Sequence, residues 1–176
     1  PLRAGLFQTL KEMGANIAIG NSRIEAGEPV ADLIVRSSKL NGVVVPAERA
    51  PTMIDEYPIL AIAASNAIGT TCMQGLAELR VKESDRLTAI TDGLRACGVN
   101  VNTDKDNLIV NGTKKNIKGG ATVETRMDHR IAMSFLVLGL NAKNPIAVDD
   151  DKHISTSFPS FVSIMNDLGA QIRKVN

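Results

Sequence analysis

Apolar residues follow helical spacing in three parts of the chain. Near the start, Leu6, Leu10 and Met13 recur at helical intervals, which predicts an amphipathic helix. Residues 54–64 (IDEYPILAIAA) and 127–137 (MDHRIAMSFLV) are instead apolar on almost every side. A helix that is apolar all round is a buried helix. The pattern therefore predicts two buried helices, each followed by a turn and a short strand.

A short phrase occurs three times, as LKEMGANI (10–17), LRACGVNV (94–101) and MNDLGAQI (165–172). Each copy contains the end of an amphipathic helix, a glycine, a small apolar residue, an amide and a β-branched residue. The glycine predicts a helix C-cap with positive φ, and the residues after it predict a strand. Such self-similarity is typical of folds built from repeated units.

Together these patterns describe a unit that runs buried helix, strand, amphipathic helix and strand pair. We expect one α/β (α+β) domain over residues 1–176, with helices inside and strands outside. The expected boundaries are a partial first repeat at 1–45, a second repeat at 46–111 and a third repeat at 120–176.

Composition narrows the classes of partner. With 44% apolar and 22% charged residues, and no apolar run near the roughly 18 to 20 residues that span a bilayer, we expect no membrane insertion. A net charge of +1 with four Phe, one Tyr and no Trp argues against a nucleic-acid partner. Cys72 and Cys97 lie in apolar contexts and favour a reducing, cytoplasmic compartment. Because Pro1 leads directly into a helical pattern, we expect the natural start to lie upstream.

The stretch LRVKESDRL (79–87) places cations at the start of a predicted helix. On a helical wheel, Glu83 falls on the apolar stripe, with Lys82 and Arg86 along its rim and Asp85 facing water. Cations oppose the macrodipole at a helix N-terminus unless an anion is present. Two explanations stay open, namely local pairing with neighbouring carboxylates on a surface helix and a site for an anionic ligand.

The buried helices carry charges at their starts as well. Asp128 is a predicted N-cap with Arg130 in the following turn, and Asp55 is a predicted N-cap with Pro58 tolerated in the first turn. If parallel helices bring these ends to one edge, Asp55 and Arg130 meet the cations and carboxylate of residues 82–86. One carboxylate could then serve as a base, while one against apolar surface could serve as an acid. No metal site is expected, since His129 and His153 have no further ligand at suitable spacing.

Four motifs, LRVKESDRL, DHRIAM, MIDEYPILA and TSFP, closely resemble the 5-enolpyruvylshikimate-3-phosphate synthase family, most of all its glyphosate-tolerant bacterial subclass. The similarity covers essentially the whole chain. It implies transfer of the enolpyruvyl group of phosphoenolpyruvate to the 5-hydroxyl of shikimate 3-phosphate, with release of phosphate and no cofactor. It also implies two domains, each made of βαβαββ units with buried parallel helices and outer mixed four-stranded sheets. The chain would correspond to the C-terminal-side domain, and the other domain would be absent.

The resemblance also implies residue roles. Asp55 would accept the 5-hydroxyl proton and contact shikimate 3-phosphate, with Lys82 beside it to assist. Glu83 would protonate the methylene carbon of phosphoenolpyruvate. Arg86 and Arg130 would hold the carboxylate of phosphoenolpyruvate, or glyphosate as a competitor in its place.

Two positions depart from the commonest family pattern, which has Lys where Thr156 stands and Asn where Glu78 stands. Without the N-terminal-side domain of the enzyme, we expect the chain to carry half of an active site and to be inactive alone. Two alternatives are a UDP-N-acetylglucosamine enolpyruvyl transferase, and a non-catalytic fragment that binds anions or acts as a scaffold.

Overall fold

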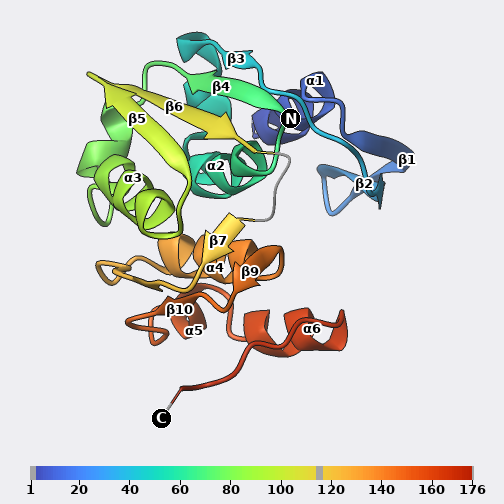
Figure 1. The fold of residues 1–176 in the computed structure, drawn as a ribbon. Helices are drawn as coiled ribbons and strands as arrows, with labels where there is room; N and C mark the ends of the chain where they lie inside the picture. The colour runs from blue at the N-terminus through green and yellow to red at the C-terminus, as the bar shows by residue number, and fades with distance from the viewer. Residues whose placement is uncertain (1–2, 114–116, 176) are drawn as a thin grey trace.

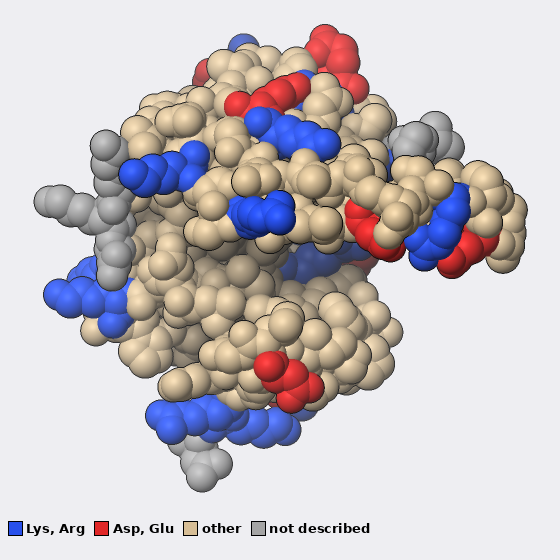
Figure 2. All heavy atoms as spheres, turned by 90° about the vertical axis from the view of Figure 1, so that its right-hand side faces the viewer, with Lys and Arg blue, Asp and Glu red and all other residues tan. Residues whose placement is uncertain are grey.

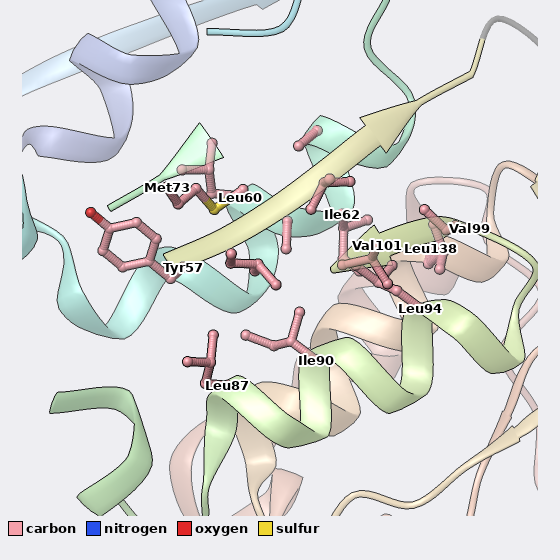
Figure 3. Close-up of a cluster of buried hydrophobic side chains, with 14 of the residues drawn as sticks. Tyr57, Leu60, Ile62, Met73, Leu87, Ile90, Leu94, Val99, Val101 and Leu138 are labelled. Carbon is pink, nitrogen blue, oxygen red and sulfur yellow. The ribbon is translucent and has the colours of Figure 1, made fainter. Parts of the chain in front are cut away.

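The computed structural model describes residues 3–113 and 117–175. Helices lie in the interior and short strands cover them, as the sequence predicts (Figure 1). One apolar core joins α2 (Tyr57–Ser65), α3 (Arg86–Ala96) and α4 (His129–Gly139) to the inner face of the largest sheet. Figure 3 shows side chains from these helices meeting those of the sheet, among them Leu60, Met73, Ile90 and Val101.

The largest sheet is mixed and four-stranded, in the order β3-β4-β6-β5. β3 and β4 are parallel, and the other neighbours are antiparallel. The strands are β3 (Val44–Val45), β4 (Gly69–Met73), β5 (Asn100–Asp104) and β6 (Asn107–Gly112). Along β6, Leu108 and Val110 are fully buried against the helices, while Ile109 between them is only partly buried. The predicted mixed four-stranded sheet is confirmed in this part of the chain.

Both buried helices connect parallel strands. α2 lies between β3 and β4, and α4 lies between β8 (Thr122–Val123) and β10 (Ala147–Val148), which also pair in parallel. A second parallel pair, β7 (Ile117–Gly119) with β9 (Ala142–Asn144), flanks α4 as well. Parallel strands need a crossover connection, and here the apolar helices supply it. The two predicted buried helices are therefore confirmed.

Shorter elements complete the fold. In the described part of the chain, short 3₁₀ helices come before two of the longer helices. η1 (Ala47–Thr52) and η2 (Ile54–Glu56) precede α2, and η3 (Ala77–Val81) precedes α3. A short helix, α5 (Ile154–Ser157), packs against α4. None of the helices in the described part of the chain combines the length and apolar content that crossing a bilayer requires.

The three repeated glycines have the predicted backbone. Gly14, Gly98 and Gly169 have φ values of +96°, +84° and +100° and follow the ends of helices. A strand follows each of the first two. After α6 (Phe161–Asp167) and Gly169, however, residues 170–175 form no strand, so the third expected strand is wrong. A strand requires a hydrogen-bonded neighbour, and within the described residues none lies beside this segment.

The hairpin near the N-terminus is largely uncovered. α1 (Gly5–Glu12) leads into β1 (Asn16–Glu25) and β2 (Glu28–Arg36), which among the described strands pair only with each other and project from the body (Figure 1). Ile19 is 52% exposed and Val35 is 66% exposed. Figure 2 views that side of the molecule and shows charged side chains scattered over a mostly uncharged surface. The hairpin thus presents an exposed apolar face.

Replacing Leu33 and Val35 with Thr is expected to reduce self-association of the chain, because both side chains lie on this exposed face. Sedimentation velocity at rising protein concentration measures the effect. The free energy of unfolding should change by less than about 0.5 kcal/mol per substitution. Ile17 and Val101 end two copies of the repeated phrase, and they pair with Val35 and Val110, so Val110 is the buried counterpart of Val35. Val110→Thr is therefore the control, and it should lower the free energy of unfolding by about 1–3 kcal/mol. Undiminished association would rule out this face as its cause.

Candidate functional site

Three helices begin at one place in the structure. Asp55 lies in η2 just before α2, Arg86 is the first residue of α3, and Arg130 lies in the first turn of α4. Arg86 Nη1 donates a hydrogen bond to Asp55 Oδ1 at 3.1 Å, and Arg130 Nη1 donates to the Asp55 carbonyl at 3.0 Å. Lys82 Nζ lies 3.8 Å from Asp55 Oδ1. The structure thus brings these four candidate residues together.

Arg86 is the fully buried centre of this cluster. Its Nε donates to Asp128 Oδ2 at 2.7 Å, and its Nη2 lies 2.6 Å from Glu83 Oε2 and 3.4 Å from Asp128 Oδ1. With Asp55, three carboxylates surround one guanidinium. Arginine offers five N–H donors in a planar fork, and the protein itself already occupies most of them here. An anionic ligand would gain this guanidinium by replacing one of the carboxylates.

The predicted position of Glu83 is wrong. Asp85, and not an earlier residue, is the N-cap of α3, because its carboxylate accepts hydrogen bonds from the backbone N–H and the hydroxyl of Thr88. Lys82 and Glu83 therefore precede the helix, and the helical wheel does not apply to them. The Glu83 side chain is 55% exposed instead of lying on an apolar stripe. An Asp followed three residues later by a Thr is the signal that could have located this helix start.

Lys82 connects the site to a position where the sequence departs from the family pattern. Its Nζ lies 2.7 Å from Glu78 Oε1, and Glu78 belongs to η3. The Lys82 side chain is mostly buried, while Glu78 is exposed. Glu78 thus adds a negative charge at the edge of the cluster, where Asn would add none.

Asp55 is held as a carboxylate and does not cap α2. The N-cap position of α2 is Glu56, without a side-chain capping bond, and Pro58 lies in the first turn as predicted. Asp55 instead forms an ion pair with Arg3, a residue that the sequence analysis did not identify. Burial would raise the pKa of Asp55, but the hydrogen bond from Arg3 and the charges of Arg130 and Lys82 outweigh it and lower that pKa. Asp55 is therefore ionised at neutral pH.

Asp128 caps α4 as predicted, and its Oδ1 accepts from the backbone N–H of Arg130 at 2.9 Å. The apolar pattern does not indicate that this carboxylate is fully buried or that it binds Arg86. Burial acts to raise the pKa of Asp128, but the hydrogen bond and charge of Arg86 are the main reasons that it is lowered overall. A buried ionised carboxylate thus lies directly behind the cationic cluster.

Other candidate positions lie outside this cluster. Thr156 is exposed in α5, where its hydroxyl donates to the backbone carbonyl of His153 at 2.7 Å. Within residues 3–113 and 117–175, no group of His, Cys, Asp or Glu side chains is arranged to hold a metal ion. The groups that the cluster itself offers are side-chain carboxylates, guanidinium groups and one ammonium group near helix N-termini.

Curated relatives of the chain are named 3-phosphoshikimate 1-carboxyvinyltransferase. The protein from Paramagnetospirillum magneticum is 66% identical over 172 residues, which is 98% of this chain and 39% of that relative. The protein from Rhodospirillum rubrum is 62% identical over 98% of this chain and 38% of its own length. The chain thus spans about two fifths of the length of the curated relatives it matches.

Solved structures agree with this relationship. An EPSP synthase from Acinetobacter baumannii matches 98% of this chain and 40% of that chain, with a TM-score of 0.94 and 41% identity. The enolpyruvyl transferase NikO from Streptomyces tendae covers 97% of this chain and 36% of its own, with a TM-score of 0.74 and 22% identity, which shows a shared fold alone. The family profile described as EPSP synthase (3-phosphoshikimate 1-carboxyvinyltransferase) matches residues 1–165. The chain therefore belongs to the EPSP synthase family.

Proposed function

We propose that the chain is the part of a 3-phosphoshikimate 1-carboxyvinyltransferase that carries one half of the active site, and that it is inactive alone. The observation that carries this proposal is the meeting of Arg86, Lys82 and Arg130 at Asp55, from the starts of three helices. A cluster of cations at helix N-termini suits anionic substrates such as phosphoenolpyruvate and shikimate 3-phosphate. An ionised carboxylate beside these cations suits proton removal from a hydroxyl.

In the reaction we propose, the 5-hydroxyl oxygen of shikimate 3-phosphate bonds to the phosphate-bearing carbon of phosphoenolpyruvate. Asp55 accepts the hydroxyl proton, with Lys82 beside it, and Glu83 delivers a proton to the methylene carbon. Glu83 then takes back one proton from the resulting methyl group while phosphate leaves with the proton that Asp55 holds, and the carbon–carbon double bond is restored. The balance of atoms requires no cofactor.

Arg86 and Arg130 are assigned to the carboxylate of phosphoenolpyruvate, where glyphosate would compete. In the ligand-free protein, Glu83 is bound to Arg86. A substrate carboxylate that takes this place on the guanidinium would release Glu83, whose carboxylate could then take up a proton and deliver it to the methylene carbon. Binding and proton delivery would then be coupled through one ion pair. Phosphoenolpyruvate and shikimate 3-phosphate are both anionic metabolites. We propose that the enzyme acts on them in the cytoplasm.

The test is phosphate release from phosphoenolpyruvate and shikimate 3-phosphate. The chain is assayed alone, and then together with the part of the Paramagnetospirillum magneticum relative that lies outside the matched segment. We expect no turnover from the chain alone, turnover from the combination, and much less turnover when the chain carries Arg130→Ala. Turnover by the chain alone at the rate of an intact enzyme would contradict the half-site assignment. Turnover only when UDP-N-acetylglucosamine replaces shikimate 3-phosphate would favour the other transferase.

A binding measurement distinguishes the proposed half-site from a scaffold that has no anion site. Phosphoenolpyruvate is titrated into the isotopically labelled chain, and the amide resonances of Arg86 and Arg130 are followed. A saturable response at these two positions supports the proposal, and a uniform absence of response supports the scaffold.

A further inference from the structure

A buried carboxylate that the proposed chemistry does not use lies behind the site. The side chains of Asp128 and Arg86 are both fully buried. Asp128 Oδ2 accepts from Arg86 Nε at 2.7 Å, and Asp128 Oδ1 lies 3.4 Å from Arg86 Nη2. These contacts occupy one side of the guanidinium. The opposite side, formed by Nη1 and Nη2, faces Asp55 and Glu83.

The same carboxylate also joins two further segments. Its Oδ1 accepts from the backbone N–H of Arg130 at 2.9 Å and so caps α4, and its Oδ2 accepts from the hydroxyl of Ser84 at 3.1 Å. One buried group therefore links the start of α3, the residues before it, and the start of α4. Arg130, anchored in this way, extends its side chain to the Asp55 carbonyl at 3.0 Å and toward Glu56 at 3.6 Å.

We propose that Asp128 is a positioning residue for anion binding, which holds Arg86 and Arg130 with their terminal nitrogens directed toward one ligand carboxylate. The inference rests on the proposed function, in which these two arginines bind phosphoenolpyruvate. Asp128 itself does not touch the substrate. Asp128 is fully buried and holds Arg86 at its Nε atom. The Nη1 and Nη2 atoms remain for partners that a ligand can replace, namely Asp55 and Glu83. An arginine without this anchor would have several rotamers available, and binding would have to order it.

A merely structural role predicts a different result. If Asp128 only caps a helix and fills a buried ion pair, its substitution lowers stability and leaves ligand affinity unchanged once the protein is folded. Asp85 is the matched control, since it caps α3 through Thr88 and pairs with Arg80. Its carboxylate contacts Thr88 and Arg80 and not the two arginines of the site, so replacing it with Asn tests the loss of a capping residue's charge by itself.

The experiment compares Asp128→Asn with Asp85→Asn in the combination of this chain and the remainder of the Paramagnetospirillum magneticum relative. Asn keeps the size of Asp and one oxygen for the N–H of Arg130, but it removes the charge that binds Arg86. We expect Asp128→Asn to raise KM for phosphoenolpyruvate by roughly 10-fold or more, with kcat changed by less than about 3-fold. We expect Asp85→Asn to change KM by less than about 2-fold. Equal KM values for Asp128→Asn and the unmodified protein would overturn the inference.

A second measurement does not depend on the folding of a variant. The Nε–H resonance of Arg86 is observed in the labelled, unmodified chain while phosphoenolpyruvate is added. We expect this resonance to be protected from exchange with water and to keep its shift, while the Nη resonances move. A shift of the Nε–H resonance as large as that of the Nη groups would overturn the inference. If the unmodified chain shows no response and the unmodified combination shows no turnover, the proposed function itself fails, and the inference fails with it.

Discussion

Replacing Arg86 with Met is expected to lower the free energy of unfolding by about 3–5 kcal/mol at neutral pH. The substitution leaves Asp128 fully buried without the guanidinium that neutralises it. Such a loss is a large part of the total stability of a typical domain, which is roughly 5–15 kcal/mol. Urea unfolding, followed by circular dichroism, measures the difference.

The stability difference between the Arg86→Met variant and the unmodified protein should depend on pH. In the unmodified protein the pKa of Asp128 is lowered, so this group contributes stability above the ordinary pKa of Asp and loses it as the pH falls through the lowered value. Without Arg86, burial, which is the largest effect on the pKa of Asp128 and raises it, is opposed by the hydrogen bonds from Arg130 and Ser84, and we expect this pKa to rise. The variant should therefore regain stability relative to the unmodified protein as the pH falls below about 5. A deficit that is the same at every pH would contradict an origin in this ion pair.

A double substitution supplies the control. Arg86→Met combined with Asp128→Asn removes both charges and leaves no buried ion without a partner. We expect the double variant to be more stable than Arg86→Met alone, with a coupling energy of roughly 1–3 kcal/mol. Additive effects of the two substitutions would mean that the contact at 2.7 Å contributes little.

Glu83→Ala is expected to lower kcat of the combined enzyme by about 100- to 10,000-fold, which is the usual contribution of a general acid. Its effect on KM for phosphoenolpyruvate should be small or even favourable, because Glu83 competes with a ligand carboxylate for Arg86. Steady-state kinetics with both substrates varied separates the two parameters.

Arg130→Ala is the counterpart of that substitution. It removes a cation but no proton donor, so we expect KM for phosphoenolpyruvate to rise roughly 10- to 100-fold, with a smaller change in kcat. Glyphosate inhibition should weaken in parallel. The opposite pattern, in which Glu83→Ala mainly affects KM and Arg130→Ala mainly affects kcat, would refute the assigned roles.

The sequence predicted the helix layer well because the spacing of apolar residues within one segment indicates both that the segment is helical and that it is buried. The apolar runs at 54–64 and 127–137 gave both buried helices, and three glycines gave the positive-φ caps. The strand expected after Gly169 is absent because a strand is stabilised by its neighbour, and a neighbour is not a local property. The exposure of the hairpin could not be predicted for the same reason, because the residues of β1 and β2 do not determine whether a helix covers them.

The candidate site shows the same division at the scale of single residues. Lys82, Arg86 and Arg130 could be selected from the sequence because cations at helix starts are unusual, and Asp55 could be selected because it precedes a buried helix. The place of Glu83 could not, because it depends on whether Asp85 or an earlier residue caps α3, and that choice is decided by the hydrogen bonds to Thr88. Arg3 was missed because its contact with Asp55 joins residues far apart in the chain.

By itself, the sequence determined which segments become helices, which helix ends carry charge, and to which family the motifs are similar. These properties depend on neighbouring residues and on the period of the apolar pattern. Only the tertiary structure decided that Arg86 is fully buried among three carboxylates, and that Asp128 links α3 to α4. The charge and hydrogen bonds of a buried ion pair become meaningful only when distant segments exclude water from it together.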